Sequence, residues 1–541
     1  MRIKIIFICL FVLTCMAVQA QKEAYNWTFG YNAGLTWNTK QQYVYGNFDV
    51  VSGQYKSVLS MPTPFKSSIN TYKGCFALSD GATGDLLLYS DGKTVYESKG
   101  SSIGSNLNGH SLSAQSGILM PFPGARNRGK YIVVTAPEKL TAYQRPSYSV
   151  IQISNGVPEL LNTTEHPMNA ELQNGKGVMG GSVTAIQHAN RRDFWIVAPG
   201  SGKTEEATKT TAINAWKVTK DGVDALNPVV NKDGLPEVDA FGNGATSHGY
   251  IKFSPNGKNF VWVYFGVNNS SFMVGHFDTK TGEVGKNAKV VQLYYDGQKI
   301  GANGLEFSHS GKYLYIVSSA GTLYAYNFES LINNPTTAIP KIYDLGYEET
   351  SGSVTNKLFP GVPQLGPDKL IYMTVYNASA STLSPANSRR HMYVIENPEI
   401  NPNSSTPLNI YRLKNFLTVN TGGHSGITSF SPSFFATDVD GPTEVCVGEE
   451  NTYTFMIGGT EDTRPNKIQW FFGEDGTYTE QIINADGSLT KECKMTYTTL
   501  GTKQLTVKVF VKDVLSETID IEVDVLDCSY PVNPHLRSAY K

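Results

Sequence analysis

Apolar residues along this chain occur in short runs, without the spacing of an amphipathic helix. Residues 86–89, 131–134, 194–197 and 313–317 are such runs, and Gly, Asn or Asp residues lie close to their ends. Short apolar or alternating runs between turn residues indicate β-strands, whereas helices place apolar residues at i, i+3, i+4 and i+7. The pattern therefore predicts an almost wholly β-structured protein.

These strand runs recur as a repeat. Its clearest copies are residues 249–258 (GYIKFSPNGK) and 304–312 (GLEFSHSGK), and weaker copies begin near Gly181, Val362 and Gly426. Equivalent positions in successive copies are 65 and 54 residues apart. An all-strand repeat of this length corresponds to one four-stranded blade with its loops. We therefore expect a WD40-like β-propeller of seven blades, with six and eight as alternatives.

The two ends of the repeat region are expected to meet. Six complete blades fit between about residue 70 and residue 416, which leaves strands in residues 27–51 and 427–435. These two segments can complete a seventh blade together and so remove the open edges of the fan. The propeller domain is placed at residues 21–436.

A second β-domain is predicted after a polar, turn-rich segment at residues 438–442. New strands follow at residues 451–456, 470–472 and 504–511. Strands of this kind over roughly ninety residues favour an Ig-like β-sandwich, placed at residues 437–530. Residues 531–541 form a tail in which Pro531, Asn533, His535 and Arg537 suggest a docking peptide, the alternative being a frayed terminus.

The N-terminus has the pattern of an export signal. Arg2 and Lys4 precede a short apolar run at residues 5–18, and small residues at Val18 and Ala20 predict cleavage after Ala20. We expect the mature protein to begin at Gln21. Its destination is the periplasm, the outer membrane or the cell surface, and no transmembrane segment is expected after cleavage.

The charge balance argues against a nucleic-acid partner, because 45 basic residues stand against 47 acidic ones.

Export changes the expectation for the cysteines, since disulfides form outside the cytoplasm. Cys446 precedes the first strong strand of the small domain and Cys528 follows its last. The first and last strands of such a sandwich run side by side, so we predict Cys446–Cys528, with Cys446–Cys493 as the alternative. Cys75 is expected to be a free, buried thiol.

No catalytic, cofactor or metal motif is found in the sequence. Three of the nine histidines, His188, His248 and His424, lie near equivalent blade starts. Because inner strands line the central channel of a propeller, these side chains are candidate channel-lining residues. A structural role in hydrogen bonding between blades is the favoured interpretation, and a metal or catalytic centre is the alternative.

Several motifs resemble a family of exported Bacteroidetes proteins that carry a propeller followed by PKD domains. Residues 26–35 (NWTFGYNAGL) are similar to the family's opening WYFGNNAGL. The matches continue in family order at residues 74–80, 84–92, 113–116, 249–255 and 395–398, and residues 470–476 resemble the PKD pattern. This resemblance implies a propeller, an Ig-like PKD domain and, in many members, a C-terminal sorting domain for type IX secretion. No such sorting domain follows the PKD-like segment here.

These observations favour a non-catalytic envelope or surface protein. The propeller is expected to bind a protein or a glycan, and the PKD-like domain to act as a spacer or docking module. One alternative is a glycan-acting hydrolase or lyase, which requires convergent carboxylates or histidines in the channel. Another is an accessory component of a type IX secretion or gliding machine. The fold alone does not choose among them.

Overall fold

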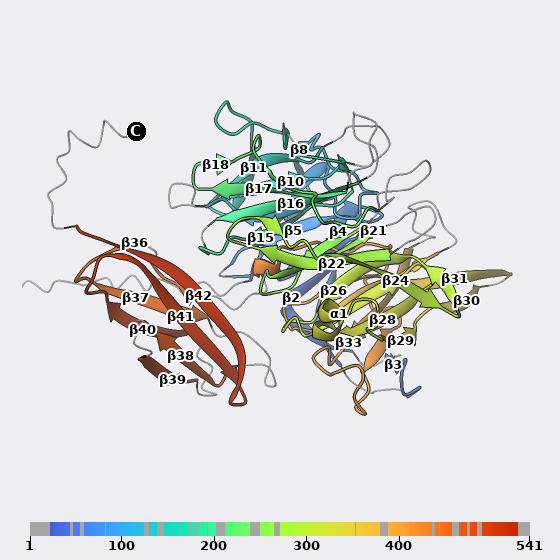
Figure 1. The fold of residues 1–541 in the computed structure, drawn as a ribbon. Helices are drawn as coiled ribbons and strands as arrows, with labels where there is room; N and C mark the ends of the chain where they lie inside the picture. Colours follow the sequence, from blue (N-terminus) through green and yellow to red (C-terminus); the bar gives the residue numbers. More distant parts are fainter. Residues whose placement is uncertain are drawn as a thin grey trace, which may run out of the picture.

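A computed structural model gives the fold of the protein (Figure 1). It describes residues 22–528 except 44–46, 55–58, 82, 124–128, 138–144, 174, 180, 192, 202–210, 239–248, 265–270, 352, 379–387, 435–438, 443, 457–464, 473–476 and 484–489. The predicted signal peptide (residues 1–20) and the tail with Pro531, Asn533, His535 and Arg537 lie outside the described residues. In the described part of the chain, no helix is both long and apolar enough to span a bilayer.

The described residues before 414 form seven antiparallel sheets, which we number as blades. Blade 1 contains β1 (Asn26–Phe29), β2 (Tyr31–Tyr43) and β4 (Leu59–Asn70). Blade 2 contains β5 (Phe76–Ser79), β6 (Leu86–Ser90), β7 (Thr94–Glu97) and β8 (Ser102–Ser105). Blade 3 contains β9 (Gly117–Pro121), β10 (Lys130–Thr135), β11 (Ser147–Ser154), β12 (Val157–Leu161) and β13 (Ala170–Glu171). Blade 4 contains β14 (Val178–Met179), β15 (Thr184–Gln187), β16 (Phe194–Ser201), β17 (Ala212–Thr219), β18 (Gly222–Val223) and β19 (Val229–Asn231).

The remaining three blades follow in chain order. Blade 5 contains β20 (Ile251–Phe253), β21 (Asn259–Tyr264), β22 (Ser271–Asp278), β23 (Glu283–Val284), β24 (Lys289–Tyr295) and β25 (Gln298–Ile300). Blade 6 contains β26 (Ala302–Phe307), β27 (Tyr313–Ser318), β28 (Thr322–Asn327) and β29 (Lys341–Asp344), with α1 (Phe328–Asn333) after β28. Blade 7 contains β30 (Tyr347–Ser351), β31 (Val354–Leu365), β32 (Ile371–Asn377), β33 (Ser388–Ile395), β34 (Ile410–Leu413) and the N-terminal strand β3 (Asn47–Asp49).

The apolar runs in the sequence are mainly the second strands of these blades. β6, β10, β16, β21 and β27 each lie between an inner strand and a third strand. Blades also pack face to face, and the buried side chains between blades 3 and 4 form one continuous apolar cluster. A strand covered on both faces needs apolar residues at successive positions, which explains the unbroken runs. The fold is a seven-bladed β-propeller, as the repeat predicts.

Ring closure differs from the sequence prediction. Of the predicted strand at residues 427–435, the described residues 427–434 contribute no strand to a blade; they contain the isolated bridge Cys75↔Thr428 and the 3₁₀-helix η2 (Pro432–Phe434). Blade 1 is built from N-terminal strands alone, and β3 reaches over to pair with β34 at the outer edge of blade 7. Closure therefore comes from the start of the chain, because β34 offers the unpaired edge that β3 covers.

Aromatic packing holds the first and last blades together. The Trp27 ring in β1 lies 4.5 Å from that of Trp37, and both pack edge-on against Tyr372 of β32, at 5.9 and 5.4 Å between centroids. Tyr372 also donates a hydrogen bond to the buried Asp368 carboxylate. Large buried aromatic side chains contribute strongly to such contacts, so this cluster joins residues more than 300 positions apart.

The last two sheets form a β-sandwich, which Figure 1 shows beside the propeller. One sheet contains β35 (Val439–Asp440), β37 (Glu450–Met456) and β40 (Thr490–Thr496). The other contains β36 (Glu444–Cys446), β42 (Val514–Leu526), β41 (Gly501–Val511), β38 (Lys467–Phe471) and β39 (Tyr478–Ile482). A single apolar cluster around the fully buried Trp470 fills the space between the sheets.

The disulfide prediction is confirmed. Cys446 and Cys528 are bonded, with their Cα atoms 5.5 Å apart. The pairing follows from topology, because β36 runs parallel to β42 and so brings the two cysteines to the same end of the sheet. Cys493 and Cys75 are buried free thiols, as expected for Cys75. The Cys493 side chain belongs to the sandwich core.

Candidate functional site

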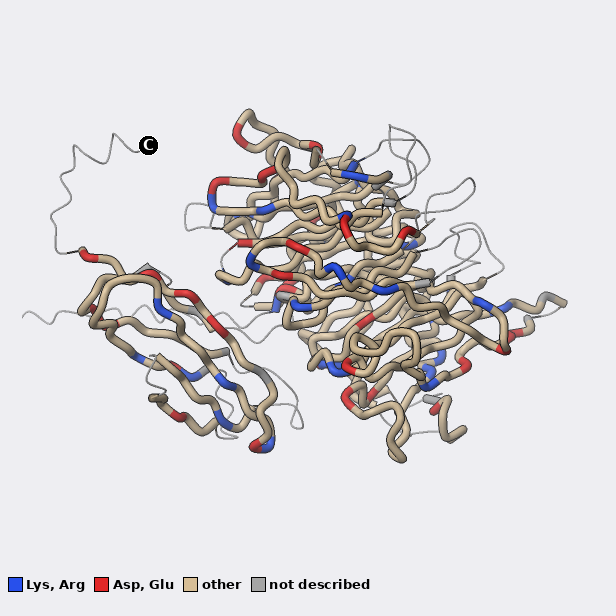
Figure 2. Tube along the Cα trace, viewed as in Figure 1, with Lys and Arg blue, Asp and Glu red and all other residues tan. Residues whose placement is uncertain are grey.

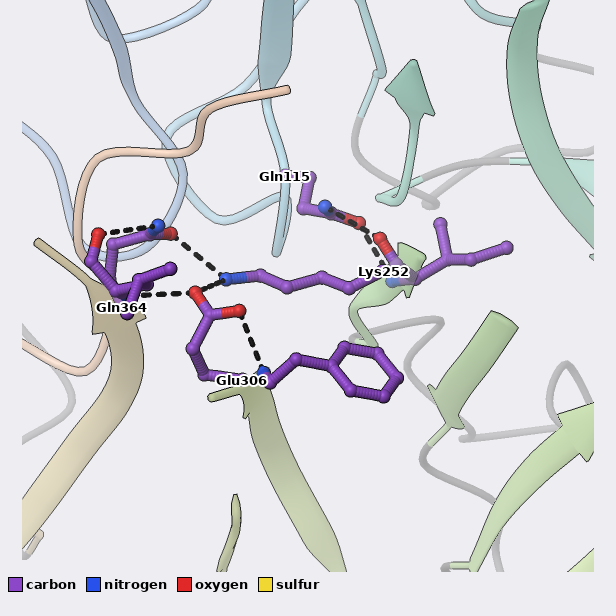
Figure 3. A network of polar contacts seen from close by, with 7 residues as sticks. Gln115, Lys252, Glu306 and Gln364 are labelled. Carbon is purple, nitrogen blue, oxygen red and sulfur yellow. Dashed lines mark hydrogen bonds and ion pairs between the residues drawn. The ribbon is translucent and has the colours of Figure 1, made fainter. Parts of the chain in front are cut away.

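The central channel is the first place to look for a site, because the inner strands of all blades converge there. Three inner strands each carry a polar residue between apolar neighbours: Lys252 in β20, Glu306 in β26 and Gln364 in β31. The apolar neighbours pack between blades, whereas the three polar side chains point toward one another (Figure 3).

These three residues form a closed hydrogen-bond network. The Lys252 ammonium donates to Glu306 at 2.7 Å and to Gln364 at 2.9 Å. The Glu306 carboxylate also accepts the backbone N–H groups of Leu365 at 2.9 Å and Phe307 at 2.8 Å. Both charged side chains are only 8% exposed. A buried ion pair is tolerated when further hydrogen bonds compensate for lost hydration, as they do here.

A second set of polar contacts crosses the channel from blade 3. The Gln115 side chain, just before β9, accepts a hydrogen bond from the backbone N–H of Ile251 at 2.9 Å and donates to its carbonyl at 3.0 Å (Figure 3). The amide thus pairs with β20 as a neighbouring strand would. The network of Lys252, Glu306 and Gln364 with Gln115 links blades 3, 5, 6 and 7 near the axis.

The channel also contains a piece of the chain itself. Every residue of the segment 421–431, here called the crossing segment, is buried. Its backbone bonds to blade 1 through Tyr31 and to blade 7 through Arg389 and Val362. It then reaches blade 2, where Ser429 donates to the Cys75 carbonyl at 2.8 Å, and blade 4, where the Ser431 hydroxyl donates to the Ala185 carbonyl at 3.3 Å. The segment predicted to be a blade strand therefore fills the channel.

A small cavity lies between the network and the crossing segment. The cavity between Lys252, Glu306 and Gln364 on one side and Phe430 and Pro432 on the other has a volume of about 30 Å³. That is room for about two water molecules and for no larger ligand. Lys252, Glu306 and Gln364 already bond to one another or to backbone N–H groups, so the network acts as a bridge between blades.

His188 and His424, the two predicted channel histidines that the structure describes, contact different residues. His188 follows β15 and contacts the Lys280 carbonyl through its Nε2 atom at 3.0 Å, beside Trp195. His424 belongs to the crossing segment and packs on Tyr72, with ring centroids 4.9 Å apart. His248 lies outside the described residues. The contact of His188 with Lys280 joins blade 4 to blade 5.

His424 is chemically unusual. The residue is 1% exposed, and neither ring nitrogen has a hydrogen-bond partner in the described structure. Burial, together with the positive charge of Arg389, lowers the pKa of His424 to about 4. The imidazole is therefore neutral at ordinary pH and contributes to packing. Among the described residues, no group of three or more His, Cys, Asp or Glu side chains is arranged to hold a metal ion.

Sequence reasoning missed the residues that do meet in the channel: Gln115, Lys252, Glu306 and Gln364. A signal was present, because three repeat copies place a polar residue at the same position of an otherwise apolar inner strand. The sequence favoured histidines as the candidate channel residues instead, because of their side-chain chemistry. The alternation itself marks the channel face of each inner strand.

Comparison with known proteins finds distant structural similarity only. No protein-family model and no curated sequence matches the chain. Among solved structures, Kluyveromyces lactis Hsv2 is 11% identical over 72% of this chain and 98% of its own, with a TM-score of 0.32. The C-terminal WD40 domain of Sif2 is 9% identical over 65% of this chain and 89% of its own, with a TM-score of 0.30. The extracellular domain of B. thetaiotaomicron BT4673 is 10% identical over 95% of this chain and 86% of its own, with a TM-score of 0.16.

Proposed function

We propose that this protein is an exported, non-catalytic binding or scaffold protein of the cell envelope. The propeller supplies the binding surface, directed to a protein or a glycan, and the C-terminal sandwich acts as a spacer or docking module. The signal-peptide pattern at residues 1–20 and the resemblance to exported propeller-plus-PKD proteins support export.

The observation that carries this proposal is the filled channel. A glycan-acting enzyme of the kind considered from the sequence needs free carboxylates or histidines facing an open channel. Here Glu306 is bonded to Lys252 and to two backbone N–H groups. The crossing segment packs against the inner strands of blades 1, 2, 4 and 7, and the cavity between it and the network has a volume of about 30 Å³. A partner must therefore bind at the rims, at the outer blade surfaces or on the sandwich.

Surface charge supports a specific, local contact over long-range attraction. In the described part of the chain, basic and acidic residues are interspersed along the trace and no region carries one sign alone (Figure 2). The formal net charge is −2. Electrostatic steering needs a field of one sign, so recognition here depends on short-range complementarity.

The test is affinity capture from envelope fractions of the source cells with the purified mature chain. A discrete glycan or protein that binds saturably supports the proposal. Hydrolysis or elimination of polysaccharides in a glycan panel would contradict the non-catalytic role. Recovery of the native protein from the cytoplasm with residues 1–20 intact would contradict export.

A further inference from the structure

A groove lies between the outer parts of blades 3 and 4, away from the channel. It has a volume of about 290 Å³. Small-molecule sites begin at roughly 300 Å³, so the groove has the size of a small ligand and is about ten times larger than the channel cavity. We call it the blade 3–4 groove. Nothing in the channel network uses its residues.

The floor of the groove is apolar. It continues the buried cluster between the two blades and includes Ile132 of β10, Val150 of β11 and Val223 of β18. Ile132, Val150 and Phe122 are buried, whereas Tyr148 and Val223 are partly exposed to the groove. This aromatic and aliphatic surface suits the C–H face of a ring-shaped ligand.

The inner rim carries a fixed hydrogen-bonding pair. The Lys130 ammonium contacts Nε2 of His166 at 3.1 Å. The His166 ring packs edge-on against Phe122, 5.9 Å between centroids, and its side chain is only 11% exposed. The pair is therefore positioned before any ligand arrives, and Lys130 retains further N–H donors.

The outer rim adds one lysine and two carboxylates. Glu165 lies beside His166, with 3.9 Å between the nearest oxygen and Nε2, and is 85% exposed. On the blade 4 side, Lys220 and Asp221 precede β18, form an ion pair with 3.6 Å between nitrogen and oxygen, and are 67% and 66% exposed. Two lysines thus face two carboxylates, so the formal charges of Lys130, Lys220, Glu165 and Asp221 cancel.

We infer that the blade 3–4 groove binds a neutral sugar ring, as the terminal unit of a glycan. Sugar hydroxyls both donate and accept hydrogen bonds, so they match a rim that offers ammonium donors and carboxylate acceptors together. The apolar floor matches the C–H face of the ring. A phosphate or a uronate would gain from the lysines but would be repelled by Glu165 and Asp221. This inference rests on the proposed binding function and names the ligand class for the glycan case.

The test is calorimetric titration of the mature protein with glucose, galactose, mannose and N-acetylglucosamine, and with glucuronate and glucose 6-phosphate as charged probes. Saturable binding of at least one neutral sugar, tighter than that of either charged probe, is expected. Lys130→Met removes a charged donor and should weaken that binding by roughly tenfold or more. Lys341→Met, at an exposed position on β29, is the matched control and should leave the affinity unchanged.

Asp221→Asn provides a second variant at an exposed turn, where folding is not at risk, and should also weaken binding. Failure of all four neutral sugars to bind, tighter binding of a charged probe, or equal effects of Lys130→Met and Lys341→Met would overturn the inference. Capture from envelope fractions is run in parallel. If wild-type protein captures a partner but binds no sugar, the groove assignment fails while the proposed function stands. If a sugar binds but nothing is captured, the groove assignment stands while the proposed function fails.

Discussion

Removal of the Glu306 carboxylate is the sharpest test of the channel network. Glu306→Ala deletes the acceptor for Lys252 at 2.7 Å and for the backbone N–H groups of Leu365 and Phe307. It leaves a lysine side chain that is 8% exposed with Gln364 as its remaining partner. Breaking a buried pair from one side costs about 3–5 kcal/mol, so we expect a loss of that size in the free energy of unfolding.

A double-mutant cycle separates the charge from the packing. Lys252→Met should also be destabilising, because the Glu306 charge then lacks its counterion. The double variant Lys252→Met with Glu306→Met removes both charges and fills the space with flexible apolar side chains. It should be more stable than the sum of the single effects predicts, by about 1–3 kcal/mol.

Urea unfolding followed by tryptophan fluorescence measures these changes. Five of the six tryptophans belong to the propeller, and Trp470 reports the sandwich. The sandwich transition serves as an internal control, since the substitutions lie far from it in the fold. Two results would show that the pair is not buried and coupled as described. One is a loss in the free energy of unfolding below about 1 kcal/mol for Glu306→Ala, and the other is a double-variant effect equal to the sum of the two single-variant effects.

Three further predictions concern the crossing segment and the sandwich. The folded-state pKa of His424, about 4, lies below its ordinary value of 6.5. The contribution of the buried neutral imidazole to the free energy of unfolding is therefore complete above pH 6.5 and is lost as the pH falls through 4. His424→Asn should reduce this pH dependence, measured by urea unfolding, by up to about 3 kcal/mol; an unchanged slope would contradict the burial of the ring. Gly426→Ala would place a Cβ atom 2.0 Å from the Lys73 carbonyl oxygen and should lower stability by about 3 kcal/mol or more, whereas a melting temperature equal to wild type would show that the segment is not packed there. Cys528→Ser should weaken the sandwich by about 4 kcal/mol in the chain-entropy account, and peptide mapping of the wild type that recovers Cys446 joined to Cys493 would refute the pairing.

The sequence was a good guide wherever a feature depends on local pattern. Second strands such as β10 and β27 were visible because two packed faces demand an unbroken apolar run. The disulfide was predictable since Cys446 and Cys528 flank the first and last strands of a sandwich whose ends adjoin. The role of residues 427–435 was not predictable, because a short apolar stretch can form either an edge strand or a buried connection.

The sequence by itself determined the class of fold, because it follows from strand periodicity and repeat length. It favoured seven blades and the Cys446–Cys528 pairing, and the tertiary structure decided both. Only the tertiary structure decided what fills the channel and which polar residues meet there. Lys252, Glu306 and Gln364 are separated by 54 and 58 positions in the chain, and their contact depends on how three blades are rotated about one axis. Such contacts arise from the packing of whole sheets, and no local propensity encodes them.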